Sequence, residues 1–221
     1  MKYPYLLHAR GVRHQPIFRG LKGDPFVLDL SCGNPLLDVV DVRDQRAFQQ
    51  LLDRQMAPRY SWGFAGYLEN RSSLLRDCPQ MVEEGRFFHL GLDILVPLGS
   101  ALHAPLAAVV SGTGYEEGEG NFGGYVLLCH REPGAEPFYS LYGHLCPESL
   151  PDDGRLLQAG QPFARIGDFH ENGNWFYHTH LQILTEEALR RGYLSKGYAA
   201  EADLGVMNAL CPSPVPLFKR G

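Results

Sequence analysis

Short apolar or alternating runs recur along the chain from Gly85 onward, and each is followed by a stretch rich in turn-forming residues. The runs are RFFHLGLDILVP, ALHAPLAAVVSG, GGYVLLCH, PFYSLYGHL, PFARIG and FYHTHLQIL, and the stretches between them include GTGYEEGEGNFGG and PDDGRLLQAG. Short strands at such spacing are typical of antiparallel β structure. The pattern predicts an antiparallel sheet, sandwich or barrel, followed by a helix in TEEALRRGY that is capped by Thr185.

The residues before this region are less regular. The stretch DVRDQRAFQQLLDRQM predicts a helix from Asp41 to Met56, with its apolar side chains on one face and Pro58 just beyond its end. PFVLDL predicts a strand, and WGFAGYLENRSSLL predicts a short strand and a turn. We therefore expect a mainly β fold of the α+β class. An N-terminal extension over residues 1–84 would pack on or cap a core domain over residues 85–221.

Composition and charge narrow the class of protein. Hydrophobic residues make up 44% and charged residues 20% of the 221 residues, which favours an ordinary globular protein over a disordered one. The net charge of -5 gives no electrostatic reason to expect nucleic acid or an anionic membrane as a partner. Because no apolar run is long enough for a signal peptide or a membrane span, we expect a cytoplasmic protein. The oligomeric state is left open.

The cysteines support the same compartment. Five are present, and no two of them form a CxxC pair. This count and spacing argue against a zinc ribbon or a dithiol redox motif. Free thiols in a reducing compartment are the expectation.

Four of the nine histidines, all within the predicted strands, are candidates for chemistry: His89, His144, His178 and His180. In HLGLDIL, the alternation of side chains along a strand places Leu90, Leu92 and Ile94 on one face, and His89 and Asp93 on the other. On a straight strand, His89 and Asp93 would lie ~13 Å apart. They can bind one metal ion only if the chain bends between them, and the intervening glycine is where a bend costs least. The segment is therefore expected not to be a regular strand throughout.

The remaining strand histidines each have a notable neighbour two positions away. The same alternation predicts that Tyr142 and His144 share a face, and that His178 and His180 share a face with Cα atoms ~6.6 Å apart. Zinc binds histidine nitrogen at ~2.0–2.1 Å, and a catalytic zinc keeps three protein ligands and an open water position. One histidine of HTH can therefore bind a metal ion, while the other stands beside the water as a base or supports a developing oxyanion.

Other metal sites use similar motifs. Cupin barrels also contain HxH, but both histidines then bind the metal, and a Glu and a further His follow. Here the first Glu after His180 is Glu186, and no His follows. A cupin is therefore disfavoured, whereas a mononuclear iron site of two His and one carboxylate stays open.

Taken in order, the motifs resemble those of the lysostaphin-type zinc metallopeptidases, the β-lytic or glycyl-glycine endopeptidase family. The match runs from HLGLDILVPLGSALHAPLAAVV through YSLYGHL and LLQAGQPFARIG to HTHLQI, over residues 85–184. The resemblance implies a mostly antiparallel β fold with an open groove. It also implies one zinc ion per chain, bound by His89, Asp93 and His180.

The activity that the resemblance implies is endopeptidase cleavage of a peptide bond. His144 and His178 would flank the zinc-bound water, one as general base and the other as support for the oxyanion, and which does which is left open. The implied substrate is a peptide or peptidoglycan fragment that contains Gly or D-amino acids. Two alternatives stay open: a zinc-containing binding or scaffold module of the same fold without turnover, and non-haem iron oxygenase chemistry.

The chain departs from the family pattern just before HTH. Family members usually approach this motif through a Ser/Thr-Gly-rich turn, whereas this chain has GDFHENGNWFYHTH. We therefore expect a different groove near Trp175, with His170 and Glu171 at its rim. The N-terminal extension either completes the sheet or covers the groove. The other histidines match no ligand position and are expected to be structural or exposed: His8, His14, His103 and His130.

Overall fold

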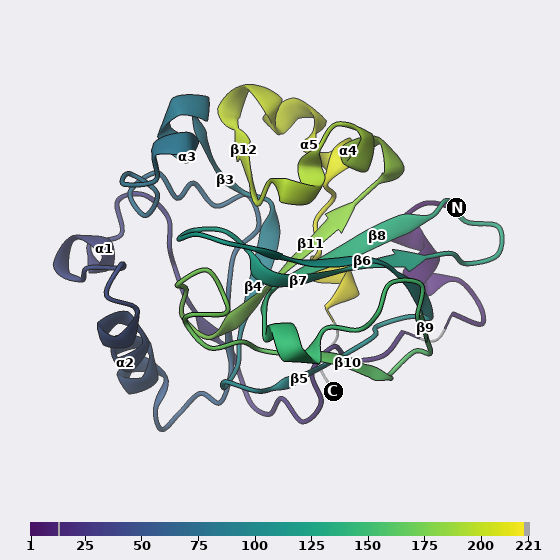
Figure 1. Cartoon of the computed structure of the whole chain (residues 1–221), viewed down its shortest axis with the longest axis horizontal. Helices are drawn as coiled ribbons and strands as arrows, with labels where there is room; N and C mark the ends of the chain where they lie inside the picture. The colour runs from purple at the N-terminus through teal and green to yellow at the C-terminus, as the bar shows by residue number, and fades with distance from the viewer. Residues whose placement is uncertain (13, 219–221) are drawn as a thin grey trace.

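An eight-stranded sheet runs through the molecule. The computed structural model describes residues 1–12 and 14–218 (Figure 1). In spatial order, the strands of this main sheet are β1 (Phe26–Val27), β2 (Gly63–Ala65), β4 (Gly91–Leu95), β11 (His178–Leu184), β8 (Phe138–Leu145), β7 (Gly123–His130), β6 (Ala108–Glu116) and β9 (Leu156–Leu157). β1 and β2 run parallel, and the other neighbours pair antiparallel. The expected mainly β fold is confirmed, and the N-terminal residues add the parallel pair.

Short helices connect the strands. α2 (Gln45–Met56) ends where predicted but begins after Asp41, because the Asp44 side chain caps it by accepting a backbone hydrogen bond at 3.0 Å. α4 (Glu186–Arg190) follows its Thr185 cap as predicted. The others are α1 (Leu36–Val39), α3 (Pro79–Glu84), α5 (Leu204–Leu210) and the 3₁₀ segments Tyr5–His8, Pro147–Ser149, Tyr193–Ser195, Glu201–Asp203 and Val215–Leu217. Among the described residues, no helix is long and apolar enough to cross a membrane.

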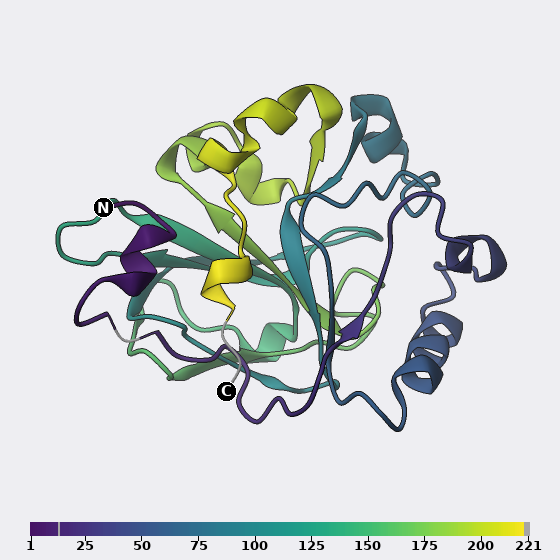
Figure 2. The same cartoon turned by 180° about the vertical axis from the view of Figure 1, so that it is seen from behind.

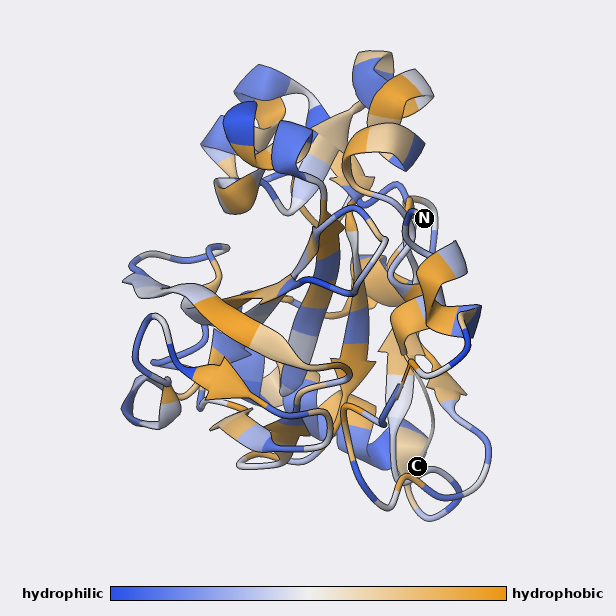
Figure 3. Ribbon diagram, turned by 90° about the vertical axis from the view of Figure 1, so that its right-hand side faces the viewer, coloured by the Kyte–Doolittle hydropathy of each residue, from blue (hydrophilic) through white to orange (hydrophobic). Residues whose placement is uncertain are grey.

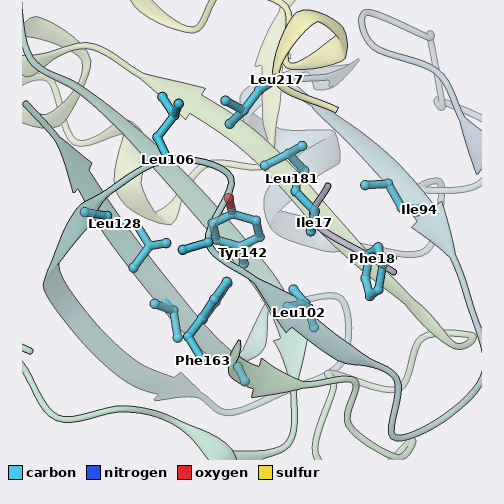
Figure 4. Close-up of a cluster of buried hydrophobic side chains, with 14 of the residues drawn as sticks. Ile17, Phe18, Ile94, Leu102, Leu106, Leu128, Tyr142, Phe163, Leu181 and Leu217 are labelled. Atoms are coloured by element: carbon cyan, nitrogen blue, oxygen red, sulfur yellow. The ribbon is translucent and has the colours of Figure 1, made fainter. Parts of the chain in front are cut away.

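One face of the main sheet packs against a small sheet made of β5 (Ala101–His103) and β10 (Pro162–Arg165). Hydrophilic and hydrophobic residues alternate along the central strands (Figure 3), so every second side chain points to this core. Tyr142 lies at its centre, with its ring centroid 5.0 Å from that of Phe163 (Figure 4). The N-terminal segment also contributes buried side chains to this core: Leu6, Leu7, Ile17, Phe18 and Trp62.

The opposite face is covered by two groups of elements. α4, α5 and a small sheet of β3 (Arg86–His89) and β12 (Tyr198–Ala200) pack on one part of it, through residues such as Leu184 and Met207. α1 and α2 lie beyond the β1–β2 edge (Figures 1 and 2) and enclose a third cluster around Phe48. The central strands are therefore buried on both faces.

The chain changes sheets at Leu90. β3 pairs with β12, whereas β4 pairs with β2 and β11. The break confirms the predicted bend between His89 and Asp93. It also shows that one prediction was wrong: Leu90 does not share a face with Leu92 and Ile94 but packs in the opposite core. The alternation of a single strand does not continue across the break.

A bulge in β8 re-aims His144. The pairing with β7 shifts by one residue, so that Gly143 and His144 together face Tyr125. His144 also has a φ of +67°, a left-handed conformation that side chains rarely adopt. Because the extra residue reverses the alternation, Tyr142 points into the core while His144 points to the other face. The prediction that these two residues share a face was wrong.

Gly91 is required by the close approach of β4 and β11. A Cβ atom at this position would lie 2.7 Å from both ring nitrogens of His180, whose buried imidazole cannot move aside without losing its hydrogen bond to Gln182. We expect Gly91→Ala to lower the free energy of unfolding by about 1–3 kcal/mol through overpacking. Denaturant unfolding of the purified proteins measures this change.

Gly112→Ala is the matched control, because Gly112 also lies in a strand and a Cβ there would meet no atom within 4 Å. It should change stability by no more than about 0.5 kcal/mol. Equal stability of the two variants would contradict the close approach.

Candidate metal centre

Three side chains that lie far apart in the sequence meet on the face of the main sheet that carries α4 and α5. His89 ends β3, Asp93 lies in β4 and His180 lies in β11. His89 Nε2 is 3.0 Å from His180 Nδ1, and Asp93 Oδ1 is 3.2 Å from the first nitrogen and 3.4 Å from the second. All three side chains are buried. The structure thus brings together the three predicted ligand residues.

The tautomers of the two histidines follow from their outer partners. His89 Nδ1 is 2.8 Å from the Gly66 carbonyl oxygen, and His180 Nε2 is 2.9 Å from Gln182 Oε1. The Gln182 amide nitrogen donates to the Lys196 carbonyl, which fixes the orientation of the amide. Because these oxygens can only accept, the facing ring nitrogens carry the hydrogens. In neutral imidazole rings with these tautomers, the nitrogens turned toward Asp93 present lone pairs, as a metal ligand must.

This arrangement of acceptors calls for a cation. Asp93 Oδ1 is buried and has no hydrogen-bond partner within the described part of the chain, and it faces two bare nitrogens. Acceptors in such a dry site repel one another unless a cation lies between them. Zinc at ~2.0–2.1 Å from tetrahedral donors sets neighbouring donors about 3.3–3.4 Å apart, close to the observed 3.0, 3.2 and 3.4 Å. The donor set and its spacing therefore fit zinc.

A buried guanidinium holds the other oxygen of the carboxylate. Arg71 is 2% exposed, and its Nη1 donates to Asp93 Oδ2 at 2.7 Å, while its Nε donates to Glu69 Oε2 at 2.8 Å. Glu69 Oε1 in turn accepts a hydrogen bond from the Leu30 backbone N–H at 3.0 Å. The ion pair leaves Oδ1 as the oxygen that is free for a metal ion.

One loop of the N-terminal segment orients two of the three ligands. Its residue Gly66 accepts from His89, and its residue Arg71 holds Asp93. Backbone hydrogen bonds fasten this loop to β3, from the His89 N–H to the Glu69 carbonyl at 3.0 Å and from the Arg71 N–H to a β3 carbonyl at 2.9 Å. Residues 66–71 are therefore an outer shell of the candidate site.

The ionisation states at neutral pH suit metal binding. Burial alone would raise the pKa of Asp93, but the positive charges of His89, when protonated, and of Arg71 lower it well below its usual range. Burial, followed by the charge of Arg71, lowers the pKa of His89 to about 4. Asp93 is thus ionised and His89 is neutral, which are the forms that bind metals.

His144 and His178 stand beside the three ligands. His178 Nε2 lies 3.6 Å from Asp93 Oδ1, and the ring centroids of His144 and His178 are 4.3 Å apart. His144 Nδ1 lies 2.8 Å from the Asn172 carbonyl oxygen, and His178 Nδ1 lies 2.8 Å from the Phe176 carbonyl oxygen, so each neutral ring has a bare Nε2. Burial lowers the pKa of His178 to about 4, and burial and then the charge of His178 lower that of His144. Both rings are neutral at neutral pH.

Asp93, His180 and these two histidines line a narrow cavity of about 30 Å³, which we call the metal pocket. Trp175, Phe122 and Tyr198 form part of its walls, and Met81 of α3 reaches it from the N-terminal segment. The expectation that Trp175 lies at the groove is confirmed. The N-terminal residues both extend the sheet and approach the site, so the two roles left open by the sequence are not exclusive.

His170 and Glu171 do not line the metal pocket within the described residues, so the expectation that they rim the groove was wrong. His170 is exposed, and its carbonyl accepts from the Tyr115 hydroxyl. The Glu171 carboxylate folds back onto the Asp168 backbone N–H at 2.8 Å. The turn chemistry of this loop satisfies Glu171 locally and directs it away from the site.

Sequence reasoning missed Arg71 and Gln182. Gln182 had a signal, because it lies two positions after His180 on the same strand face. Arg71 had none, because it lies in an irregular loop and only the tertiary fold brings it to Asp93. The remaining histidines pair with backbone carbonyls or a hydroxyl, or are exposed, as expected: His14, His103, His130 and His8.

Comparison of the sequence with models of known protein families finds no match. A comparison with curated proteins finds no significant relative. Solved structures do match. A zinc-containing peptidase from Vibrio cholerae shares 23% identity over 44% of this chain and 27% of its own, with a TM-score of 0.37. The catalytic domain of the antimicrobial peptidase lysostaphin from Staphylococcus simulans shares 17% identity over 60% of this chain and 80% of its own, with a TM-score of 0.42.

A third structure, named as an M23 peptidase from Pseudomonas aeruginosa, shares 20% identity over 59% of this chain and 43% of its own, with a TM-score of 0.39. This chain thus spans about a quarter of the Vibrio peptidase and less than half of the Pseudomonas one. One of these structures is named as lysostaphin and the other two as peptidases. At such identities and TM-scores, the matches carry no argument about the activity of this chain.

Arg71 gives a test of the outer shell. We expect Arg71→Met to weaken zinc binding by about 10–100-fold, because the Asp93 carboxylate loses the partner that orients it. Arg71→Lys keeps the positive charge but cannot contact Asp93 and Glu69 at the same time in the way that the guanidinium does. Its zinc affinity should lie between those of Arg71→Met and the natural protein. Competition with a chromophoric chelator measures the affinity.

Arg86→Met is the matched control. Arg86 is also buried, in β3, but pairs with Glu84 at 2.7 Å rather than with a ligand. Its loss should lower stability without weakening zinc binding. Unchanged affinity in Arg71→Met would contradict the assigned role of Arg71.

Proposed function

We propose that the chain is a zinc-dependent endopeptidase that hydrolyses a peptide bond, with one zinc ion held by His89, Asp93 and His180. One observation carries this proposal: three ligand atoms converge at the spacing of zinc donors, with the buried Asp93 Oδ1 left without a partner. The two further neutral histidines beside them support a hydrolytic site. A metal site that only stabilises the fold has no use for them.

The proposed chemistry divides between the metal and the two histidines. When bound, zinc lowers the pKa of a coordinated water toward neutrality and polarises the carbonyl of the substrate. His144 and His178 each offer a bare Nε2, so either can accept the proton that the attacking water loses and return it to the leaving amine. The other ring can support the oxyanion only after it has taken up a proton at Nε2, because its Nδ1–H is held by a carbonyl.

Two observations favour catalysis over a scaffold that merely contains zinc. Structural zinc sites usually have four protein ligands. The candidate ligand group found among residues 1–12 and 14–218 has three. His144 also adopts a left-handed backbone conformation within a bulge, and such strain is concentrated at functional sites. Two His and one carboxylate also suit non-haem iron, so the metal analysis below includes iron.

As substrates we propose peptides or peptidoglycan fragments that contain Gly or D-amino acids. The support is the resemblance of the motifs over residues 85–184 to the glycyl-glycine endopeptidase family. The narrowness of the metal pocket agrees with this choice, since about 30 Å³ leaves little room for a side chain at the scissile bond.

Metal analysis tests the site itself. We expect about one zinc per purified chain, and loss of that zinc in His89→Ala and in His180→Ala because two ligands hold it too weakly. Inductively coupled plasma mass spectrometry measures the content. His130→Ala is a control of the same type, since His130 is buried far from the site against Ser140. Iron in place of zinc, or no metal after supplementation, would contradict the proposal.

Kinetics test the two catalytic histidines. We expect His144→Ala and His178→Ala to keep their zinc and to lose about 10²–10⁴-fold in kcat on Gly-Gly peptides, the usual contribution of a general acid–base group. Mass spectrometry of the cleaved peptides gives the rates. Activity that survives both substitutions would have to come from another site.

A further inference from the structure

A second cavity adjoins the metal pocket, and the N-terminal segment builds most of it. Its volume is about 280 Å³. Residues from α1, from the loop before α2 and from the stretch 73–81 form one wall, and the loops at 119–121 and 173–175 form the other. Figure 1 shows the β6–β7 hairpin reaching toward the side of the molecule where α1 and α3 lie. We call this space the side cavity.

The two cavities share part of their lining. Met81, Gly120, Asn121 and Trp175 belong to both. The Trp175 indole nitrogen is buried and has no hydrogen-bond partner among the described residues. A buried donor of this kind is costly unless a ligand satisfies it. The four residues that line both cavities, which we call the junction, therefore include an unused donor.

The sizes of the two cavities assign different parts of a ligand to them. The metal pocket, at about 30 Å³, has room for about two water molecules. The side cavity, at about 280 Å³, approaches the size of an ordinary ligand site. A peptide whose scissile bond lies in the metal pocket must have a small residue there. A large side chain elsewhere in the same peptide can be accommodated in the adjacent side cavity.

The walls of the side cavity favour an uncharged side chain. Leu37, Val42 and Leu74 supply apolar surface. The charged groups of the lining already have partners. Arg43 pairs with Asp41 at 3.2 Å and with Asp77 at 4.0 Å. Arg76 pairs with Asp77 at 3.6 Å, and Glu119 accepts a hydrogen bond from the Asn174 amide at 3.0 Å. A charged ligand would compete with these pairs, whereas an apolar one would not.

We propose that the side cavity is a substrate subsite that takes a large apolar or aromatic side chain on one side of the scissile bond, while the Trp175 N–H donates to the peptide backbone at the junction. This inference rests on the proposed peptidase function. It makes the N-terminal segment a specificity element of the enzyme.

The test uses zinc-loaded full-length protein and peptides with a central Gly-Gly pair. One peptide has Ala at every flanking position, and a set carries a single Phe at successive positions on either side. We expect one placement of Phe to raise kcat/KM by about tenfold or more, as burial of a large apolar side chain permits. A second set with Lys in place of Phe should show no such gain.

Two substitutions fill the side cavity from the wall that the N-terminal segment forms, Ser73→Phe and Val42→Phe. Each should abolish the preference for Phe without loss of zinc, so that kcat/KM on the Phe peptide falls to its value on the all-Ala peptide. Ser72→Phe is the matched control, because the neighbouring Ser72 does not line the side cavity. It should retain the preference. Uniform kcat/KM across the Phe set, or a preference that survives both filling substitutions in folded protein, would overturn the subsite.

Fluorescence separates failure of the subsite from failure of the peptidase proposal. Of the two tryptophans, Trp62 is buried in the core, so a ligand at the junction acts on the emission of Trp175. Even without any cleavage, titration with at least one peptide of the Phe set should shift this emission in the natural protein and in Ser72→Phe but not in Ser73→Phe. Cleavage without a shift in emission would leave the proposed peptidase function standing and would contradict the proposed subsite.

Discussion

The candidate metal centre depends on the mutual repulsion of hydrogen-bond acceptors that are buried away from water. Asp93 Oδ1 has no partner of its own and faces bare nitrogens of His89 and His180 at 3.2 and 3.4 Å. No such cluster is stable in a low-dielectric interior without positive charge. Arg71 supplies part of that charge from one side of the carboxylate. The spacing of the remaining acceptors suits a divalent cation on the other side.

Several features of the fold serve this cluster. The change of sheet at Leu90 lets His89 and Asp93 face one point, and the bulge in β8 turns His144 toward it. The absence of a side chain at Gly91 leaves room for the His180 ring. Carbonyl groups on the outside then fix the tautomer of each histidine, so that the lone pairs point inward. Two irregularities of the strands therefore lie where the chemistry is proposed, while a further bulge in β6, between Val110 and Gly112, lies elsewhere.

Much of the fold and site was predictable from local patterns. The strands after residue 85, the end of α2 at Met56 and the cap at Thr185 followed from periodicity and capping residues. The bend between His89 and Asp93 followed from a distance argument. The errors arose where one extra or skipped residue reverses the alternation, as at Leu90 and at His144. Register changes of this kind depend on the partner strand, which is remote in the sequence.

Spacing and alternation, which act over a few residues, were enough to predict the β-rich class and the need for a bend, and the resemblance of the motifs named the candidate ligands and their neighbouring histidines. The packing of the whole chain was needed to show that Arg71 pairs with Asp93, that Gln182 and a loop carbonyl hold the two candidate ligand histidines, and that α1–α3 wall a side cavity. These contacts join segments more than twenty positions apart or depend on side-chain direction. Local preferences carry no information about such pairings, which the packing of the whole chain selects.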